Sequence, residues 1–177
     1  MHIVLVEPEI PGNTGNISRL CAAEHLTLHL VKPLGFSVDD KHLKRAGLDY
    51  WDLLDVHIHE NYESVTRMLS GHHFYFNTTK AVRAYSEVSF TPDDVLVFGK
   101  ETKGLPEELL LSHEEDCIRI PMIEEARSLN LSNAVAIVAM EALRQQGFPH
   151  LLQESGRLFH KGLQESSAKG VSGHEYV

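Results

Sequence analysis

Two polar stretches of the sequence, far apart in the chain, carry residue types that could bind an anion or orient a hydroxyl group. The first, Asn13-Thr-Gly-Asn-Ile-Ser-Arg19, opens a predicted helix over 13–24. Free N–H groups at a helix N-terminus attract anions, and arginine offers a planar fork of five donors. Both features suit an RNA phosphate, but an N-cap followed by an exposed arginine accounts for the same residues. Because arginine barely deprotonates, Arg19 would orient a group before it removed a proton.

The second stretch joins Ser128 and Asn130 to the start of a predicted helix over 131–146. Ser and Asn side chains accept hydrogen bonds from the free N–H groups of a first helical turn, and Gly147 and Pro149 end the helix. The first turns hold almost no charge, so we expect this helix to be buried on all sides. A polar loop held at such a helix is typical of a binding site. Taken alone, however, the pattern favours a capped core helix after an ordinary loop.

A third stretch, Phe98-Gly-Lys-Glu-Thr-Lys-Gly-Leu-Pro106, lies between the other two and follows a predicted strand. It could be a plain strand-to-helix connection with two turn glycines. Gly99 and Gly104 have the spacing of a phosphate-binding loop, but Leu105-Pro106 stands where that loop requires Lys followed by Ser or Thr. The chain also lacks the glycine fingerprint of a dinucleotide-binding fold. These two nucleotide-binding motifs are therefore excluded.

The elements that would position these stretches alternate between strands and helices. Apolar runs predict strands at 2–6, 26–31, 56–59, 73–77, 95–98 and 117–120, and other patterns predict helices at 13–24, 39–46, 62–69, 106–111 and 131–146. This alternation predicts an α/β fold with a mainly parallel sheet and helices on both faces. Ligands of such sheets bind at the carboxyl ends of the strands.

Composition places the chain among ordinary globular proteins. Its 177 residues and 42% hydrophobic content fit one domain with a real core, predicted over 1–150. Residues 151–177 are rich in Gly, Ser, Lys, Glu and His, so we expect a C-terminal tail, partly helical or disordered. No apolar run is long enough to span a membrane and no signal peptide is visible, which predicts a cytoplasmic protein.

The cysteines, histidines and charges limit the possible partners. Cys21 and Cys117 fit no metal or redox spacing, and histidines such as His57 and His59 form no zinc pattern, so we expect buried thiols, surface or strand histidines and no metal. The net charge of −9 argues against a broad basic surface for nucleic acid. An RNA substrate would need a local positive patch, and the best local candidate comprises Lys41, Lys44 and Arg45.

The three polar stretches resemble, in the same order, the motifs of the SPOUT methyltransferases, the α/β-knot superfamily. The spacing from Asn13 to Arg19 is similar to the first motif of its 2′-O-ribose branch, and 99–105 resembles the Gly-x-Glu-x-x-Gly-Leu segment. Arg127-Ser-Leu-Asn-Leu-Ser-Asn-Ala-Val135 resembles the third motif. The resemblance covers about residues 1–150 and is greatest to the TrmL-like tRNA (cytidine/uridine-34-2′-O)-methyltransferases.

The resemblance implies S-adenosylmethionine as cofactor, bound in a bent form by three loops at strand ends. The implied cofactor-binding residues are Asn77, Thr78, Gly99, Gly104, Ile120, Met122, Ser128 and Leu131. The implied catalytic residue is Arg19, helped by Asn13 and Glu101, with Ser128 and Asn130 ordering the catalytic loop. No metal is implied, because a sulfonium group is already an activated methyl donor.

The same resemblance implies a deep C-terminal trefoil knot, threaded by residues from about 118 onward, and a homodimer. It implies methyl transfer to a ribose 2′-hydroxyl of tRNA, at the wobble nucleotide of the anticodon stem-loop. Two alternatives remain. One is an enzyme of the same superfamily that methylates a base nitrogen, against which the Asn13 and Arg19 motif argues. The other is an RNA- or nucleotide-binding dimer without catalysis.

Overall fold

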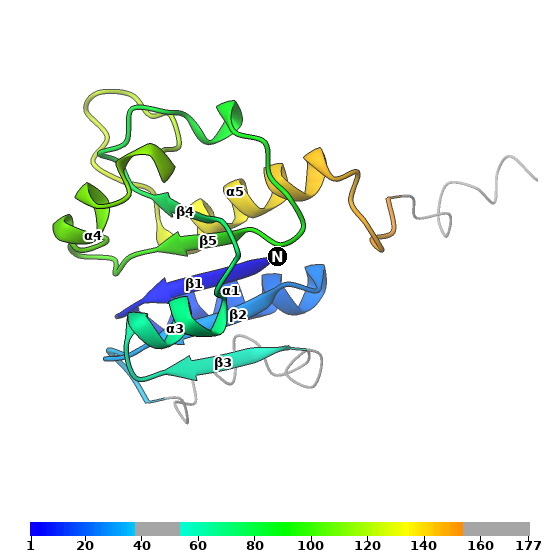
Figure 1. Ribbon diagram of the computed structural model, residues 1–177, viewed down its shortest axis with the longest axis horizontal. Helices are drawn as coiled ribbons and strands as arrows, with labels where there is room; N and C mark the ends of the chain where they lie inside the picture. The colour runs from blue at the N-terminus through cyan, green and yellow to red at the C-terminus, as the bar shows by residue number, and fades with distance from the viewer. Residues whose placement is uncertain (38–53, 154–177) are drawn as a thin grey trace, which may run out of the picture. The chain divides into compact units, whose positions relative to one another are not determined.

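A parallel six-stranded sheet forms the centre of residues 1–147 (Figure 1). The computed structural model describes residues 1–37 and 54–153. The strands are β1 (His2–Val6), β2 (Thr27–Val31), β3 (Val56–His59), β4 (Phe74–Asn77), β5 (Val95–Phe98) and β6 (Cys117–Ile118). Their order is β3-β2-β1-β5-β4-β6, and every neighbouring pair is parallel. The α/β prediction with a parallel sheet is therefore confirmed.

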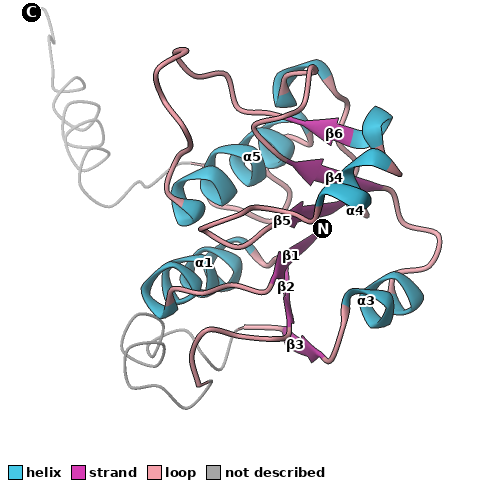
Figure 2. Cartoon of the chain, turned by 90° about the vertical axis from the view of Figure 1, so that its left-hand side faces the viewer, coloured by secondary structure: helices cyan, strands magenta, loops and turns pink. Residues whose placement is uncertain are grey.

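Helices cover both faces of the sheet, as predicted. They are α1 (Pro11–Glu24), α3 (Tyr62–Met68), α4 (Glu107–Leu111) and α5 (Leu131–Gln145). Helices α1 and α5 lie on one face, and α3 and α4 lie on the other (Figure 2). Two short 3-10 turns, Tyr85–Glu87 and Glu114–Asp116, complete the described elements. The helix predicted over 39–46, with its basic residues Lys41, Lys44 and Arg45, lies outside the described residues.

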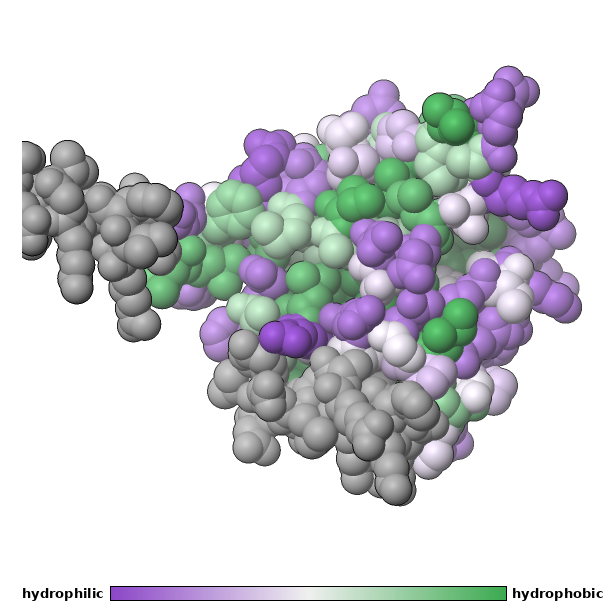
Figure 3. Space-filling view, turned by 180° about the vertical axis from the view of Figure 1, so that it is seen from behind, coloured by the Kyte–Doolittle hydropathy of each residue, from purple (hydrophilic) through white to green (hydrophobic). Residues whose placement is uncertain are grey.

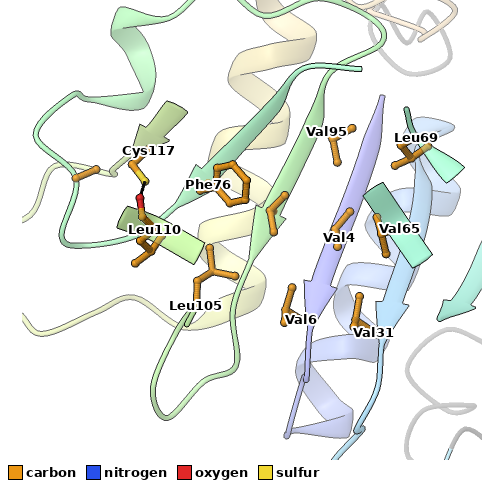
Figure 4. Close-up of a cluster of buried hydrophobic side chains, with 12 residues drawn as sticks. Val4, Val6, Val31, Val65, Leu69, Phe76, Val95, Leu105, Leu110 and Cys117 are labelled. Atoms are coloured by element: carbon orange, nitrogen blue, oxygen red, sulfur yellow. Dashed lines mark hydrogen bonds between the residues drawn. The ribbon is translucent and has the colours of Figure 1, made fainter. Parts of the chain in front are cut away.

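The core follows from strands that are apolar on both sides. In β1, Ile3, Val4 and Leu5 are fully buried, because β1 lies inside a parallel sheet that has helices on both faces. Val4 belongs to a cluster with Val65, from α3, and Phe76, from β4 (Figure 4). These contacts hold the strands in register, so their carboxyl ends meet at one edge of the sheet.

Two element boundaries differ from the prediction by two residues, and the other boundaries of the described elements agree within one residue. Strand β6 ends at Ile118 rather than Ile120, because its partner β4 ends at Asn77 and leaves Arg119 only an isolated bridge to Ala84. Helix α1 begins at Pro11 rather than Asn13, since proline suits a first helical turn.

The prediction that the helix after the polar loop is buried on all sides is wrong. The residues of α5 that face the sheet, including Val135, Val138 and Ala139, are fully buried. On the opposite side Ile137 and Met140 are 36% and 38% exposed. Apolar surface is visible on the face of the molecule that carries α1 and α5 (Figure 3). A helix that is apolar all round thus keeps one apolar side in solvent, because no described element packs over it.

A second compact unit begins at Phe148, and only its residues 148–153 are described. In these residues the N–H of Leu151 donates to the carbonyl of Phe148 at 3.2 Å, closing a turn. Within the described ranges, no helix has the length and apolar character that crossing a membrane requires.

Candidate functional site

A cavity of about 580 Å³ opens at the carboxyl ends of β4, β5 and β6. Its size falls in the range of about 300–1,000 Å³ that is usual for small-molecule sites. All the predicted site residues except Arg19 line this cavity: Asn13, Asn77, Thr78, Gly99, Glu101, Gly104, Ile120, Met122, Ser128, Asn130 and Leu131. They meet because the three strands are neighbours, so the loops that follow them share one edge of the sheet.

The carboxylate of Glu101 joins the third stretch to the first. It accepts hydrogen bonds from the N–H of Glu9 at 2.8 Å, the N–H of Ile10 at 3.2 Å and the Asn13 side-chain amide at 3.0 Å. Helix α1 has no side-chain cap of its own, so Glu101 places the negative charge that a helix N-terminus favours. In return the carboxylate of Glu9 accepts from the N–H of Thr102 at 3.1 Å and from its hydroxyl.

Asn130 joins the second stretch to the same group. Its Nδ2 donates to Asn13 Oδ1 at 2.9 Å, while its Oδ1 accepts from the N–H groups of Ser132 and Asn133 and so caps α5. Asn13 is only 6% exposed and is held by Glu101 and Asn130 together. We call these three residues, Asn13, Glu101 and Asn130, the loop network. Because each side chain already has protein partners, the network positions the loops rather than leaving free groups for chemistry.

Gly99 and Gly104 line the cavity, and both are needed for the shape of their own loop. The loop turns back on itself through a bridge between Lys100 and Gly104, with Gly104 in the left-handed region at φ +70°. A methyl group on Gly99 would overlap the backbone of Gly104 and Leu105. The absence of a side chain at Gly99 therefore permits a close approach of protein backbone.

Comparison with known proteins decides the family. Residues 1–140 match the sequence model of the SpoU rRNA Methylase family. The chain belongs to this family. A tRNA (cytidine(34)-2′-O)-methyltransferase of Methylovorus glucosotrophus is 52% identical over 147 residues, covering 82% of this chain and 96% of that protein.

Solved structures agree with this placement among the SpoU methylases. One, described as giving structural insights into the 2-OH methylation of C/U34 on tRNA, matches with a TM-score of 0.79 and 41% identity, covering 82% of this chain and 95% of that one. An AdoMet-bound rRNA methyltransferase from Sinorhizobium meliloti matches with a TM-score of 0.73 and 26% identity, covering 86% of this chain and 57% of that one.

Arg19 is the one predicted site residue that this SpoU-family chain does not bring into the cavity. It lies on α1, exposed, six residues beyond Asn13. At 3.6 residues per turn, six residues correspond to well over one and a half turns, so the two side chains leave the helix on different sides. The side chain of Asn13 bonds to Glu101 and Asn130, whereas Arg19 does not line the cavity.

Asn77 gives the cavity a polar atom that needs a ligand. Its Oδ1 is buried without a hydrogen-bond partner, while its Nδ2 donates to the carbonyl of Val97 at 3.4 Å. A buried acceptor without a donor costs free energy. The cavity therefore suits a ligand that presents an N–H or O–H group. The amino and hydroxyl groups of S-adenosylmethionine meet this requirement, so the residues present fit the cofactor found in the AdoMet-bound neighbour.

The cavity also contains residues that the sequence reasoning did not select. They include these cationic and apolar members of the same loops: Ile10, Lys80, Lys100, Lys103, Arg127 and Leu129. Their sequence positions could have indicated them, since each lies within three residues of a predicted site residue. Among residues 1–37 and 54–153, no group of three His, Cys, Asp or Glu side chains is placed to hold a metal ion.

Proposed function

We propose that this protein transfers a methyl group from S-adenosylmethionine to the ribose 2′-hydroxyl of nucleotide 34 in the anticodon stem-loop of tRNA, in the cytoplasm. The names of the relatives, at 41–52% identity, support this substrate and position. The observation that carries the proposal is the convergence of three distant polar stretches on one cavity through Asn13, Glu101 and Asn130.

The loops at the ends of β4, β5 and β6 would hold the cofactor, which supplies a methyl group on a sulfonium leaving group. The residues proposed to bind it are Asn77, Thr78, Gly99, Gly104, Ile120, Met122, Ser128 and Leu131. Asn77 would accept a hydrogen bond through its orphaned Oδ1. The loop network fixes the walls of this cavity, and alignment of the reacting groups supplies much of the rate in such transfers.

Arg19 is proposed to orient the ribose and its neighbouring phosphate. A guanidinium that stays protonated can bind phosphate with two parallel hydrogen bonds and stabilise negative charge that develops on the hydroxyl oxygen. Ser128, in the exposed loop before α5, would complete the substrate side of the cavity. Asn13, Glu101 and Asn130 act through the loops that they hold.

A homodimer is proposed to bring Arg19 to the reaction. Arg19 does not line the cavity of its own chain, and α5 keeps Ile137 and Met140 exposed on the face that also carries α1. A second copy that covers this apolar side would bring its Arg19 towards the first copy's cavity. We expect Met140→Lys to give monomers by light scattering and to abolish methyl transfer, whereas Met68→Lys, at an exposed methionine of α3, should change neither. An active monomer would contradict the dimer.

The end of α5 supports the proposed trefoil knot. The side chain of Gln145 donates to the carbonyl of Val88 at 3.1 Å and accepts from the N–H of Phe90 at 2.9 Å, so α5 is bound to the long segment that follows β4. Residues from about 118 onward are proposed to thread a loop of the chain. Stretching the molecule by its ends should then give a shorter extended length than about 3.6 Å per residue allows, because a knot retains chain. A full extended length would contradict the knot.

The methyltransferase domain is proposed to be residues 1–150, with 151–177 as a tail. A chain that ends at residue 150 should fold and retain methyl transfer to tRNA, measured beside the full chain. Loss of folding or of transfer would show that the tail belongs to the domain.

The decisive experiment is transfer of labelled methyl groups to unmodified tRNA and to an isolated anticodon stem-loop, followed by nucleoside analysis. We expect label in a 2′-O-methylated nucleotide at position 34 of both. Arg19→Ala should lower turnover at least about 100-fold and leave cofactor affinity unchanged, whereas Arg67→Ala, on α3, should behave as wild type. Label in a base would indicate a base-methylating enzyme. Cofactor binding without transfer to any tRNA would favour the non-catalytic dimer.

A further inference from the structure

A second cavity, of about 350 Å³, adjoins the cofactor cavity along the loop after β5. Val6 and Glu7 line it from the end of β1, and Lys100 and Lys103 line it from the loop. The strand order changes direction between β1 and β5, since β2 and β3 lie outward of β1 while β4 and β6 lie outward of β5. Crevices at such a switch point are the usual ligand sites of open parallel sheets. The proposed cofactor site uses β4, β5 and β6 instead, so the switch point has no assigned ligand.

The charges of this second cavity are unusual for this chain. The described residues contain four lysines, Lys32, Lys80, Lys100 and Lys103, and all but Lys32 line it. The chain as a whole has a net charge of −9, and a negative net charge repels polyanions. The same three lysines also line the adjoining cofactor cavity, so their ammonium groups would draw an anion to this edge of the sheet.

The three ammonium groups differ in how they are held. Lys100 lies 2.5 Å from a carboxylate oxygen of Glu7, and Lys80 lies 3.2 Å from one of Glu107. Lys103 is exposed and forms no salt bridge with any described residue. The two carboxylates compensate the charges of Lys80 and Lys100, whereas Lys103 keeps its charge available for an incoming group. An ammonium group binds phosphate as a mobile point charge.

We propose that the switch-point cavity is a phosphate subsite that holds the RNA backbone beside the target nucleotide, with Lys103 as its principal contact. The inference rests on the proposed function, because an RNA substrate has to reach the adjoining cofactor cavity. The two cavities share Lys100, Lys103, Gly104 and Leu105 of one loop, so a phosphate at Lys103 lies next to the place where the ribose would react. Contacts of this kind set the position of a nucleic acid and carry no sequence preference.

The test measures binding of the anticodon stem-loop at a series of salt concentrations. Lys103→Ala should weaken RNA binding about three- to tenfold at low salt and lower the slope of log K against log salt by about 0.7, the value for one phosphate contact in single-stranded RNA. Lys32→Ala, at an exposed lysine paired with Glu60 away from the cavity, should leave the slope unchanged. Cofactor affinity without RNA, measured by calorimetry, should be the same in both variants.

Three results would overturn the subsite. An unchanged slope in Lys103→Ala would show that no phosphate is bound there. If Lys103→Ala and Lys32→Ala lowered the slope of log K against log salt equally, the effect would come from the overall charge of the protein and not from a subsite. Weaker cofactor binding in Lys103→Ala without RNA would assign the lysine to the cofactor carboxylate. Failure of the proposed function is a separate result, because a changed slope with no methyl transfer keeps the subsite, whereas methyl transfer with an unchanged slope removes it.

Discussion

The loop network and a group of histidines are both polar clusters on the same sheet, but they use charge in opposite ways. The loop network lies at the carboxyl ends of the strands, where the carboxylate of Glu101 accepts three hydrogen bonds. The histidine cluster, His2, His29 and His59, joins β1, β2 and β3 on the face that α3 covers. His57 stacks on the ring of His29, and His72 meets the ring of His2 edge to face.

Neutral rings can satisfy one another in the histidine cluster. His2 Nδ1 lies 3.1 Å from His29 Nε2, and His29 Nδ1 lies 2.9 Å from His59 Nε2. A neutral imidazole offers one donor and one acceptor, so three neutral rings can form a chain with a single direction, whereas protonation of two adjacent rings would place two donors face to face. His29 is 0% exposed.

The surroundings of these rings agree with a neutral state. Burial, and then the positive charges of neighbouring groups, lowers the pKa of His2 to about 4 and that of His29 to about 3, and burial lowers the pKa of His59. Among the facing groups, the N-terminal ammonium, His57 and His72 oppose protonation, while Asp55 and Asp93 favour it. The net effect lowers the pKa of all three rings and favours their neutral forms.

The comparison teaches which polar cluster can serve a ligand. A carboxylate has only acceptors, and backbone N–H groups can satisfy it in its charged form, so Glu101 can orient loops around a cavity. In the histidine cluster both ring nitrogens of the buried His29 bond to neighbouring rings, which leaves neither of them for a ligand. We therefore expect changes in the loop network to affect catalysis and changes in the histidine cluster to affect stability.

Among changes in these two clusters, the largest effect is expected for Glu101→Gln. The new amide keeps one oxygen as acceptor and turns its NH2 group towards the donors that the other carboxylate oxygen served, so we expect methyl transfer to fall about 100-fold and the free energy of unfolding to fall by about 1–3 kcal/mol. Steady-state kinetics and urea unfolding measure the two effects. Glu60→Gln, at a carboxylate that is 78% exposed, serves as control and should change neither quantity. Full activity in Glu101→Gln would show that catalysis does not depend on the loop network.

His29→Ala should separate stability from activity. The change leaves a cavity and removes the partner of two rings, so the free energy of unfolding should fall by about 2–4 kcal/mol. Methyl transfer per folded molecule should stay at the wild-type value, measured at a temperature where the variant is folded. A loss of turnover in fully folded protein would show that the histidine cluster contributes to catalysis, and would contradict the expectation that it affects stability alone.

The pH dependence of stability should report the histidine cluster. Histidines of the unfolded chain take up protons as the pH falls through about 6.5, whereas His2 and His29 resist protonation until about pH 4 and 3. The free energy of unfolding should therefore be fully present above pH 6.5 and decrease between pH 6.5 and about 3. Urea unfolding at several pH values measures this slope. In His29→Leu the slope should be shallower, and an unaltered slope would assign the effect to other groups.

Asn130→Asp should give the smallest effect and divide the two roles of this residue. Aspartate still accepts from Ser132 and Asn133, so the cap of α5 and the stability should change by less than about 0.5 kcal/mol. The donor to Asn13 is lost, and activity should fall about five- to tenfold, the equivalent of one hydrogen bond. Asn130→Ala, which also removes the cap, should lose about 1 kcal/mol of stability in addition. Equal stability of the two variants would show that the cap contributes nothing.

The sequence by itself determined the order of elements and much of the site. The apolar run of β1 and the alternation of strands with helices specified a parallel sheet, because a strand covered on both faces has no polar side. Polar side chains before Leu131 and the glycine at 147 located α5 within one residue at its end. The resemblance of three local stretches then selected the residues that line the cavity, since short motifs are readable without knowledge of the fold.

Only the tertiary structure decided how these parts act on one another. Glu101 and Asn13 are 88 residues apart, and His29 and His59 are 30 apart, so each pair meets only through the register of parallel strands and the loops that follow them. The same holds for Arg19, whose direction depends on the turn of α1, and for Ile137 and Met140, which stay exposed because no described element covers them. Such contacts depend on where other parts of the chain lie, and periodicity within one element carries no information about that.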